Sequence, residues 1–203
     1  QYENDYTSDG DVEAGTNHGT NVAEIVHDMA PGADLYLMKV ETVVGLEEAK
    51  DKAIDLGVDV INHSVGWFNT AYYDGTGMVS NIAADARDNG IFWVNAAGNA
   101  ARSHWQGNFY DPDGDDYHNF GGSDECNSLG VLNSGGYVTI YMTWNAWPMY
   151  PENYDLFLYN ASGVKVASSE NDQDGTDYPV ERIIHHVSRT EHYCLKVKDV
   201  NTS

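Results

Sequence analysis

Apolar residues follow two different spacings in the two halves of this 203-residue chain. Up to about residue 100, segments with a period near 3.6 alternate with short apolar runs of strand length. After about residue 102 the helical period disappears, and short runs of alternating apolar and polar residues follow. The first pattern is typical of βαβ units with a parallel sheet, and the second of antiparallel sheets. The sequence therefore predicts an α/β domain over residues 1–102 and an all-β domain over residues 103–203.

Three helices and three strands are predicted in the first half. The opening helix is expected at 18–29, with one inward apolar stripe formed by Val22, Ile25, Val26 and Met29. The remaining helices are expected at about 45–56 and 77–88, and the strands at 33–40, 58–66 and 91–99. Residues 1–16 are polar and acidic without periodicity, so no strand is expected there.

The second half is predicted to contain five strands. Tyr137, Thr139 and Tyr141 alternate with apolar neighbours, a pattern typical of an antiparallel β-sandwich or jelly-roll. The expected strands are 136–144, 154–160, 163–169, 182–188 and 191–198. An acidic loop near 107–125 is expected to join the two domains, and the all-β domain at 103–203 is expected to be an insertion ahead of a further catalytic segment.

The net charge of −22 limits the partners that the chain can bind. Nucleic acid and anionic membrane both require a positive surface, so neither is expected as a partner. The charge fits a secreted protein, a high-salt protein, a protein that holds cations, or simply a soluble acidic surface. No apolar run approaches the ~20 residues of a membrane span. The absence of an initiator Met and of a signal peptide leads us to expect a processed or trimmed chain.

Cys126 and Cys194 both lie in the second half. If the protein is exported, we expect a disulfide between them. Two buried free thiols are the alternative.

His18 stands at the first turn of the opening helix, beside Gly19. The positive end of a helix dipole disfavours imidazolium, which keeps the ring neutral and able to accept a proton. His18 lies four residues before Val22, so it is expected to extend the buried stripe. A single histidine at a helix start is more often structural, so His18 alone does not define an active site.

Four segments occur in order along the first half: "HGTNVA" (18–23), "APGADLYLMKV" (30–40), "INHSVGW" (61–67) and "VNAAGN" (94–99). Together they resemble the motifs of the subtilisin-like serine proteases, the subtilases. The resemblance covers about residues 10–100 and implies a secreted serine endopeptidase with polypeptide substrates. It also implies an extracellular or cell-surface location.

The resemblance assigns roles to individual residues. His18 matches the catalytic histidine of that family, the general base for a serine nucleophile. Ser64, Val65 and Gly66 match the strand that pairs with the substrate backbone. Asn99 matches the residue whose side-chain amide donates to the oxyanion. A helix N-cap or a turn after Gly98 is the alternative role for Asn99.

Two members of the catalytic triad have no match. The residues before His18 include Asp5, Asp9 and Asp11 but no apolar strand to carry a triad aspartate, so none is assigned. No G-T-S-M-A motif follows Asn99, and "DGTGMVS" at 74–80 has glycine in place of the nucleophile. We expect a fragment of a longer protease that is inactive alone. The alternative is a non-catalytic binding protein on the same scaffold.

Four carboxylates crowd the loop between the two predicted domains: Asp111, Asp113, Asp115 and Asp116. Such density is unfavourable unless solvent or a cation relieves it, so calcium is the expected cofactor. An EF-hand is excluded because Gly114 falls at loop position four rather than six. The alternative is an exposed acidic turn. No organic cofactor is expected.

Overall fold

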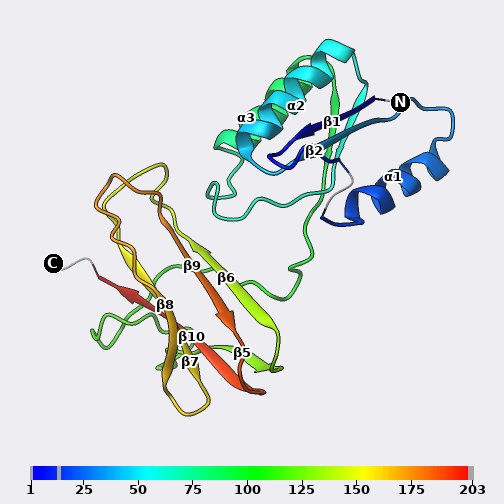
Figure 1. The fold of residues 1–203 in the computed structure, drawn as a ribbon. Coiled ribbons are helices and arrows are strands. Elements are labelled where there is room, and N and C mark those ends of the chain that lie inside the picture. The colour runs from blue at the N-terminus through cyan, green and yellow to red at the C-terminus, as the bar shows by residue number, and fades with distance from the viewer. Residues whose placement is uncertain (1, 13–14, 201–203) are drawn as a thin grey trace. The chain divides into compact units, whose positions relative to one another are not determined.

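The computed structural model describes residues 2–12 and 15–200 (Figure 1). The chain divides into two compact units. The α/β unit contains Gln1–Trp67 and Gly75–Asn99, and the antiparallel unit contains Phe68–Asp74 and Ala100–Ser203. The expected domains at 1–102 and 103–203 stay a prediction, because packing in one structure does not show which segments fold alone.

The α/β unit has the predicted alternation of helices and strands. Its elements are β1 (Tyr2–Tyr6), α1 (His18–Met29), β2 (Tyr36–Val40), α2 (Val43–Leu56), β3 (Val60–His63), α3 (Met78–Asp88) and β4 (Phe92–Asn95). Strand β1 pairs in parallel with β2, and β3 pairs in parallel with β4. The structure therefore has two separate two-stranded parallel sheets within its described residues.

The expectation that residues 1–16 contain no strand is wrong, because β1 pairs with β2 along its whole length. The strand has no apolar stripe to reveal it in the sequence, and polar contacts support it instead. Lys39 of β2 lies opposite Asp5 in the register, 3.8 Å from its carboxylate. The Lys39 ammonium also contacts the Asp9 carboxylate at 2.7 Å. Backbone pairing with β2 and the contacts of Lys39 with Asp5 and Asp9 thus stabilise a strand that the spacing of apolar residues does not indicate.

Helix α2 has well-defined ends and a close approach near its start. Thr42 caps it, accepting a hydrogen bond from Gly45 N at 3.0 Å, and Gly57 ends it in the left-handed conformation. A Cβ atom at position 45 would lie 2.8 Å from the Tyr6 carbonyl oxygen. Glycine at this position is what allows α2 to approach the end of β1.

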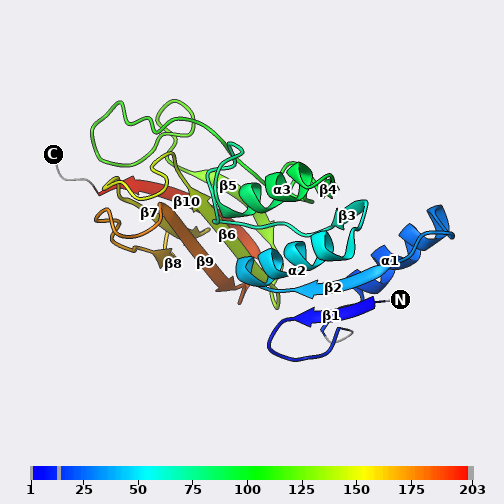
Figure 2. The ribbon, with the colours of Figure 1, turned by 90° about the horizontal axis from the view of Figure 1, so that it is seen from above.

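The core of the α/β unit lies between the β3–β4 pair and two helices. Ala53 of α2, Ala86 of α3 and Ile91 are buried together, and Ile61 and Trp93 pack against them. Figures 1 and 2 both show α2 and α3 side by side, and α2 also packs against β1 and β2. The helical periodicity correctly predicted which elements form this core.

Helix α1 differs from the prediction in its burial. The expected inward stripe of Val22, Ile25, Val26 and Met29 is not buried, and Ile25 and Met29 are 65% and 81% exposed. His18 is exposed as well, so it does not extend a buried stripe. No residue of α1 is buried, and Figure 1 shows this helix apart from α2 and α3. Periodicity reported an amphipathic helix correctly but could not show what packs against it.

The antiparallel unit contains two antiparallel sheets. Its strands are β5 (Asn127–Leu132), β6 (Tyr137–Thr143), β7 (Tyr154–Asn160), β8 (Lys165–Ser169), β9 (Val180–His186) and β10 (Glu191–Asp199). One sheet has the order β5-β10-β7-β8, and β6 pairs with β9 in the other. Five of these strands match predicted ones. Strand β5 was missed because its sequence, NSLGVL, lacks a regular apolar alternation and is interrupted by Gly130, which has positive φ.

Both sheets contribute to one hydrophobic core. Leu156, Leu158 and Leu195 come from the four-stranded sheet, and Ile183 from the other. Tyr193 of β10 is also fully buried, although its strand carries charged residues on both sides. Val138 and Ile140 pack onto this cluster from β6. The alternating pattern at residues 137–142 therefore identified the inward face of β6.

A segment from the middle of the first half packs within the antiparallel unit. The Phe68 ring stacks on Tyr141 of β6, with centroids 4.8 Å apart. The Asn69 side chain donates to the Glu181 carbonyl oxygen at 3.0 Å. Asn69 and Tyr73 adopt positive φ, a conformation that is costly for residues other than glycine. Nothing in the periodicity of the sequence predicts that residues 68–74 belong to this unit.

The Glu181 carboxylate is the centre of a polar cluster in the antiparallel unit. Its side chain is fully buried, with no solvent exposure. One carboxylate oxygen accepts hydrogen bonds from Asn171 N at 2.9 Å and Gln173 Nε2 at 2.8 Å. The other oxygen accepts from Asn171 Nδ2 at 2.8 Å and from the Ser169 hydroxyl. These donors compensate for the burial of a charge and join β8, β9 and the loop between them.

Cys126 and Cys194 form a disulfide within the antiparallel unit. Their Cα atoms lie 5.4 Å apart, and 68 positions separate them in sequence. Cys194 lies in β10, and Cys126 directly precedes β5. The bond therefore attaches β5, an edge strand, to its neighbour β10.

We predict that Asp155→Asn stabilises the antiparallel unit at neutral pH. Asp155 is buried in β7, and burial raises the pKa of its carboxyl, with Glu170 and Glu181 adding to the effect. A folded-state pKa above the unfolded value means that ionisation opposes folding, so stability falls as pH rises through that pKa. The melting temperature should rise by a few degrees at pH 7 and stay unchanged at pH 3. A lower melting temperature for the variant at pH 7 would contradict this account.

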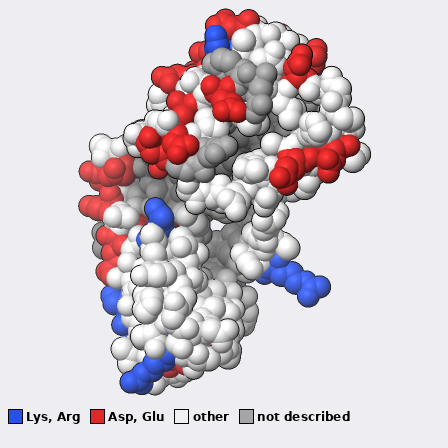
Figure 3. Space-filling model, turned by 45° about the vertical axis from the view of Figure 1, so that its right-hand side comes forward, with Lys and Arg blue, Asp and Glu red and all other residues white. Residues whose placement is uncertain are grey.

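Acidic side chains recur over the face of the molecule shown in Figure 3, in keeping with the net charge of −22. Among the described residues, no helix has the length and apolar character needed to cross a bilayer.

Candidate active site

Two of the predicted site segments begin where neighbouring parallel strands end. Residues 64–66 directly follow β3, and residues 96–99 directly follow β4. His63 and Asn95, the last residues of these strands, lie opposite one another. Ala96 N then donates to the His63 carbonyl oxygen at 3.1 Å, which extends the pairing one step further. The carboxyl edge of this sheet is where sites form in parallel α/β folds.

The structure brings His18 to the predicted substrate-binding segment. His18 is the first residue of α1, and its Nε2 lies 2.8 Å from the Ser64 carbonyl oxygen. The two residues are 46 positions apart in sequence. A carbonyl oxygen only accepts hydrogen bonds, so Nε2 carries the proton in this arrangement. A general base needs Nε2 free to accept a proton, which requires the other tautomer.

The backbone from Ser64 to Gly66 belongs to no strand within the described residues. The Asn62 side chain donates to the Ser64 hydroxyl at 3.2 Å, and Val65 is exposed. An accessible segment that directly continues a strand is suited to pairing with a further strand. Its assignment to substrate binding stays a prediction.

Asn99 lies exposed in the segment after β4. Gly98 directly before it has φ of 80°, a left-handed conformation that glycine accommodates without strain. Asn99 is therefore accessible on the same edge of the sheet as Ser64, three residues beyond the pairing of Ala96. Its role as oxyanion donor stays a prediction.

The acidic residues before His18 have other partners. Asp9 and Asp5 face Lys39, which lies 2.7 and 3.8 Å from their respective carboxylates. The Lys39 side chain and the hydroxyl of Thr7 lower the pKa of Asp9 below its usual range. Asp5 and Asp9 thus pair with Lys39, and the expectation that this segment carries no triad aspartate stays a prediction.

No role was predicted for His63, Asn95 and Trp67, which form a hydrogen-bonded group beside the site; His63 is buried, Trp67 half-buried and Asn95 exposed. His63 Nδ1 lies 2.5 Å from Asn95 Oδ1, and Trp67 Nε1 donates to His63 Nε2 at 3.2 Å. The available signal was that a polar residue ends each of two apolar strands: His63 in β3 and Asn95 in β4. It was missed because the strand was expected to run on through residue 66.

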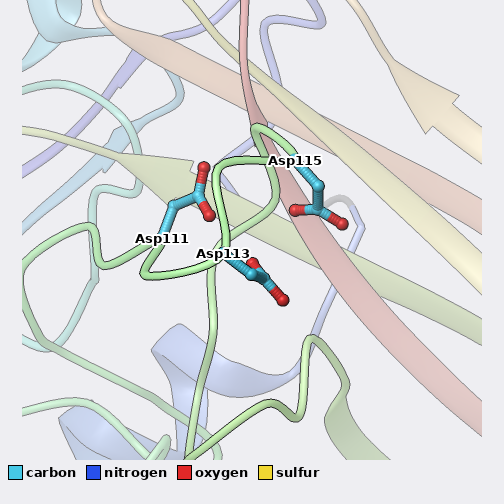
Figure 4. Close-up of side chains that lie close together, drawn as sticks. All are labelled: Asp111, Asp113 and Asp115. Carbon is cyan, nitrogen blue, oxygen red and sulfur yellow. The ribbon is translucent and has the colours of Figure 1, made fainter.

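The acidic loop brings together three of its four predicted carboxylates. Asp111, Asp113 and Asp115 each offer an oxygen atom, and these atoms lie within 4.8 Å of one another (Figure 4). Asp116 is not part of this group; its backbone N–H donates to Asp111 at 2.9 Å, and its φ is 71°. The positive φ turns the chain at Asp116, which explains why only three of the four acidic side chains converge.

The three carboxylates affect one another's ionisation. Burial and the neighbouring carboxylates of Asp111 and Asp115 raise the pKa of Asp113. Burial also acts to raise the pKa of Asp111, but the backbone N–H groups of Gly114 and Asp116 outweigh it, so this pKa is lowered. Oxygen ligands with uncompensated negative charge suit Ca²⁺ in donor type. This set supplies three of the six to eight oxygens that the ion takes, so water and backbone carbonyls would have to complete it.

Comparison with known proteins identifies the class to which this fold and site belong. A profile of the Subtilase family matches residues 1–176, so the chain belongs to the subtilase family. Proteases of this family act on polypeptides. The match extends beyond the α/β unit and through much of the antiparallel unit.

Individual relatives give a narrower comparison. The C5a peptidases of Streptococcus pyogenes serotype M18 (strain MGAS8232) and serotype M3 (strain ATCC BAA-595 / MGAS315) are each 32% identical to this chain over 119 residues. The aligned region covers 48% of this chain and 10% of each relative. The chain therefore spans about a tenth of the length of these relatives, which limits what their names imply for it.

Proposed function

We propose that this chain is part of a secreted subtilisin-like serine endopeptidase and is inactive when isolated. The observation that carries the proposal is the 2.8 Å contact between His18 Nε2 and the Ser64 carbonyl oxygen. It joins the HGTNVA helix to the N-x-S-x-G segment, as a catalytic histidine beside a substrate strand requires. Family membership over residues 1–176 supports the same reaction class.

The proposed reaction is hydrolysis through an acyl-enzyme. His18 takes the proton from a serine hydroxyl as that oxygen attacks the peptide carbonyl, and then returns it to the leaving amine. The Ser64–Gly66 backbone holds the substrate as an added strand. The Asn99 amide donates to the oxyanion, an interaction worth about 10²–10³ in rate in subtilisin itself.

The tautomer of His18 inferred from its contact with the Ser64 carbonyl oxygen supports inactivity of the isolated chain. In a triad, a carboxylate accepts from Nδ1–H and so leaves Nε2 free to accept a proton. Here the Nε2 proton is donated to Ser64, while Asp5 and Asp9 face Lys39. A serine nucleophile and an aspartate elsewhere in a longer protein would complete the arrangement.

The proposal is tested by labelling with a fluorophosphonate probe that reacts with activated serines. The isolated chain should remain unlabelled, and a longer protein containing it should label. In that protein His18→Ala should reduce the rate at least about 10⁴-fold. His27→Ala is the matched control, because His27 lies exposed on the same helix beside Asp28, and it should leave labelling unchanged. Strong labelling of the isolated chain, or an active His18→Ala protein, would refute the proposal.

A second candidate is a non-catalytic binding protein that keeps the subtilase scaffold. The exposed Ser64–Gly66 backbone favours it, since strand addition needs no nucleophile. The two functions separate in the longer protein: binding of a peptide without any cleavage or probe labelling would favour the second.

The antiparallel unit is proposed to be a β-sandwich that accompanies the catalytic part. The single core shared by its two sheets supports this assignment. Its role could be substrate recruitment, stabilisation or autoinhibition. A location outside the cell or at its surface is proposed with it, in keeping with the Cys126–Cys194 disulfide.

We further propose that the acidic loop binds Ca²⁺ through Asp111, Asp113 and Asp115. At a Ca²⁺ concentration ten times Kd, binding should stabilise the fold by about 1.4 kcal/mol and raise the melting temperature by several degrees. Asp113→Asn should abolish this rise, whereas Asp177→Asn, an exposed aspartate outside the group, should preserve it. An unchanged melting temperature in saturating Ca²⁺ would leave the loop as an exposed acidic turn.

A further inference from the structure

One hydrogen-bonded group beside the proposed site, with a buried histidine at its centre, has no part in the chemistry described above. It consists of His63, Asn95 and Trp67, and we name it the His63 clasp. His63 is only 6% exposed and ends β3, and Asn95 ends β4 directly opposite. Both side chains lie on the sheet face that also carries Ile61 and Trp93, the face that packs on the core of the unit.

The hydrogen bonds of the clasp determine the state of the His63 ring. Asn95 Nδ2 donates to the Ala96 carbonyl oxygen at 2.8 Å, which fixes the amide with Oδ1 facing His63. Since Oδ1 only accepts, His63 Nδ1 carries the proton. Trp67 Nε1–H only donates, so His63 Nε2 accepts. Both contacts require the same neutral tautomer, and each ring nitrogen has one partner.

The clasp encloses the proposed substrate-binding segment. His63 immediately precedes Ser64, and Trp67 immediately follows Gly66. Their side-chain hydrogen bond therefore closes a ring around Ser64–Gly66 and no further residues. The two rings are nearly parallel, with an angle of 4° between their planes. Asn95 connects this ring to β4, the strand that leads to Asn99.

We propose that His63 is a positioning residue that holds the Ser64–Gly66 backbone in its strand-binding conformation. The proposal rests on the proposed function for the meaning of that segment. A segment without a sheet partner samples many conformations, and ordering it on binding reduces affinity. A side-chain bond across its two ends removes part of this freedom before the substrate arrives.

Hydrogen exchange of the isolated chain tests whether the Trp67–His63 hydrogen bond restrains the backbone at this end of β3. Trp67→Phe keeps an aromatic ring but removes the indole donor, so the Ala96 amide, which donates to the His63 carbonyl oxygen, should exchange about ten-fold faster, the factor for one lost net hydrogen bond. Trp93→Phe is the matched control, because Trp93 packs on the same imidazole with ring centroids 5.3 Å apart. Equal acceleration of exchange in both variants, or throughout β1 and β2, would show that general packing, and not the Trp67–His63 hydrogen bond, is responsible.

The indole N–H resonance of Trp67 in a ¹⁵N-correlated spectrum tests the role of His63. His63→Leu should shift this resonance, because its acceptor is lost. His63→Gln offers one donor and one acceptor and should restore the native position. An identical Trp67 resonance in wild type and His63→Leu would overturn the proposal.

In an active longer protein, His63→Leu should raise KM for an extended peptide about ten-fold and change kcat less than two-fold. A single-residue ester, which needs no backbone pairing, should show no change. A fall in kcat for both substrates would show a structural role instead. If probe labelling shows no activity, the proposed function fails, while the exchange and resonance measurements still decide whether the clasp exists.

Discussion

Replacing both Cys126 and Cys194 with alanine is expected to lower the free energy of unfolding of the antiparallel unit by about 4 kcal/mol. The 68-residue separation sets this magnitude, because a cross-link over a loop of this length removes a large share of the freedom of the unfolded chain. The loss is a large fraction of the stability of an ordinary domain. Chemical denaturation, monitored by hydrogen exchange of the β7 and β10 amides, measures this loss in the free energy of unfolding.

Two comparisons separate the cross-link from local packing. Reduction of the wild-type disulfide should produce the same loss as the double variant. The β5 amides should lose protection first, since β5 is an edge strand attached to β10 by this bond. A loss below about 1 kcal/mol would show that the unfolded state gains little freedom when the bond is absent.

Glu181→Gln is expected to destabilise the antiparallel unit by about 3 kcal/mol or more. The carboxylate accepts four hydrogen bonds, and an amide keeps one oxygen while placing an NH₂ group against the other donors. Each buried donor left without an acceptor costs about 1–3 kcal/mol. Urea denaturation, monitored by hydrogen exchange of the β9 amides, measures the change in the free energy of unfolding.

Glu170→Gln is the matched control for Glu181→Gln. Glu170 is exposed, and its partner Lys165 lies 3.0 Å away with similar exposure. Such a surface pair contributes about 0–1 kcal/mol, so its loss should leave the unit nearly as stable as wild type. Equal destabilisation by the two variants would contradict a special role for the buried carboxylate.

Helices could be predicted from the sequence more reliably than the features that polar contacts stabilise. The predicted range of α1 matches the structure at both ends, and α2 ends at residue 56 as predicted. Strand β1 could not be predicted, because Lys39 and the backbone of β2 stabilise it rather than an apolar face. The burial of Glu181 depends on donors from a loop and a neighbouring strand, which no local pattern reports.

The same distinction holds for the candidate site. Motif order predicted that His18 and Ser64 belong together, and the structure places them 2.8 Å apart. The motifs could not reveal His63 and Asn95, because their pairing depends on the register of β3 with β4. The acidic loop shows the limit of composition, since backbone conformation separates Asp116 from its three neighbours.

The inclusion of residues 68–74 in the antiparallel unit has a consequence for recombination between related genes. The chain passes between units after Trp67, Asp74 and Asn99, so neither unit is encoded by one uninterrupted stretch. A crossover near codon 102 would transfer Tyr141 and Glu181 without Phe68 and Asn69, which pack against them. Exchange of the antiparallel unit between homologues should therefore succeed only when this seven-residue segment is transferred with it.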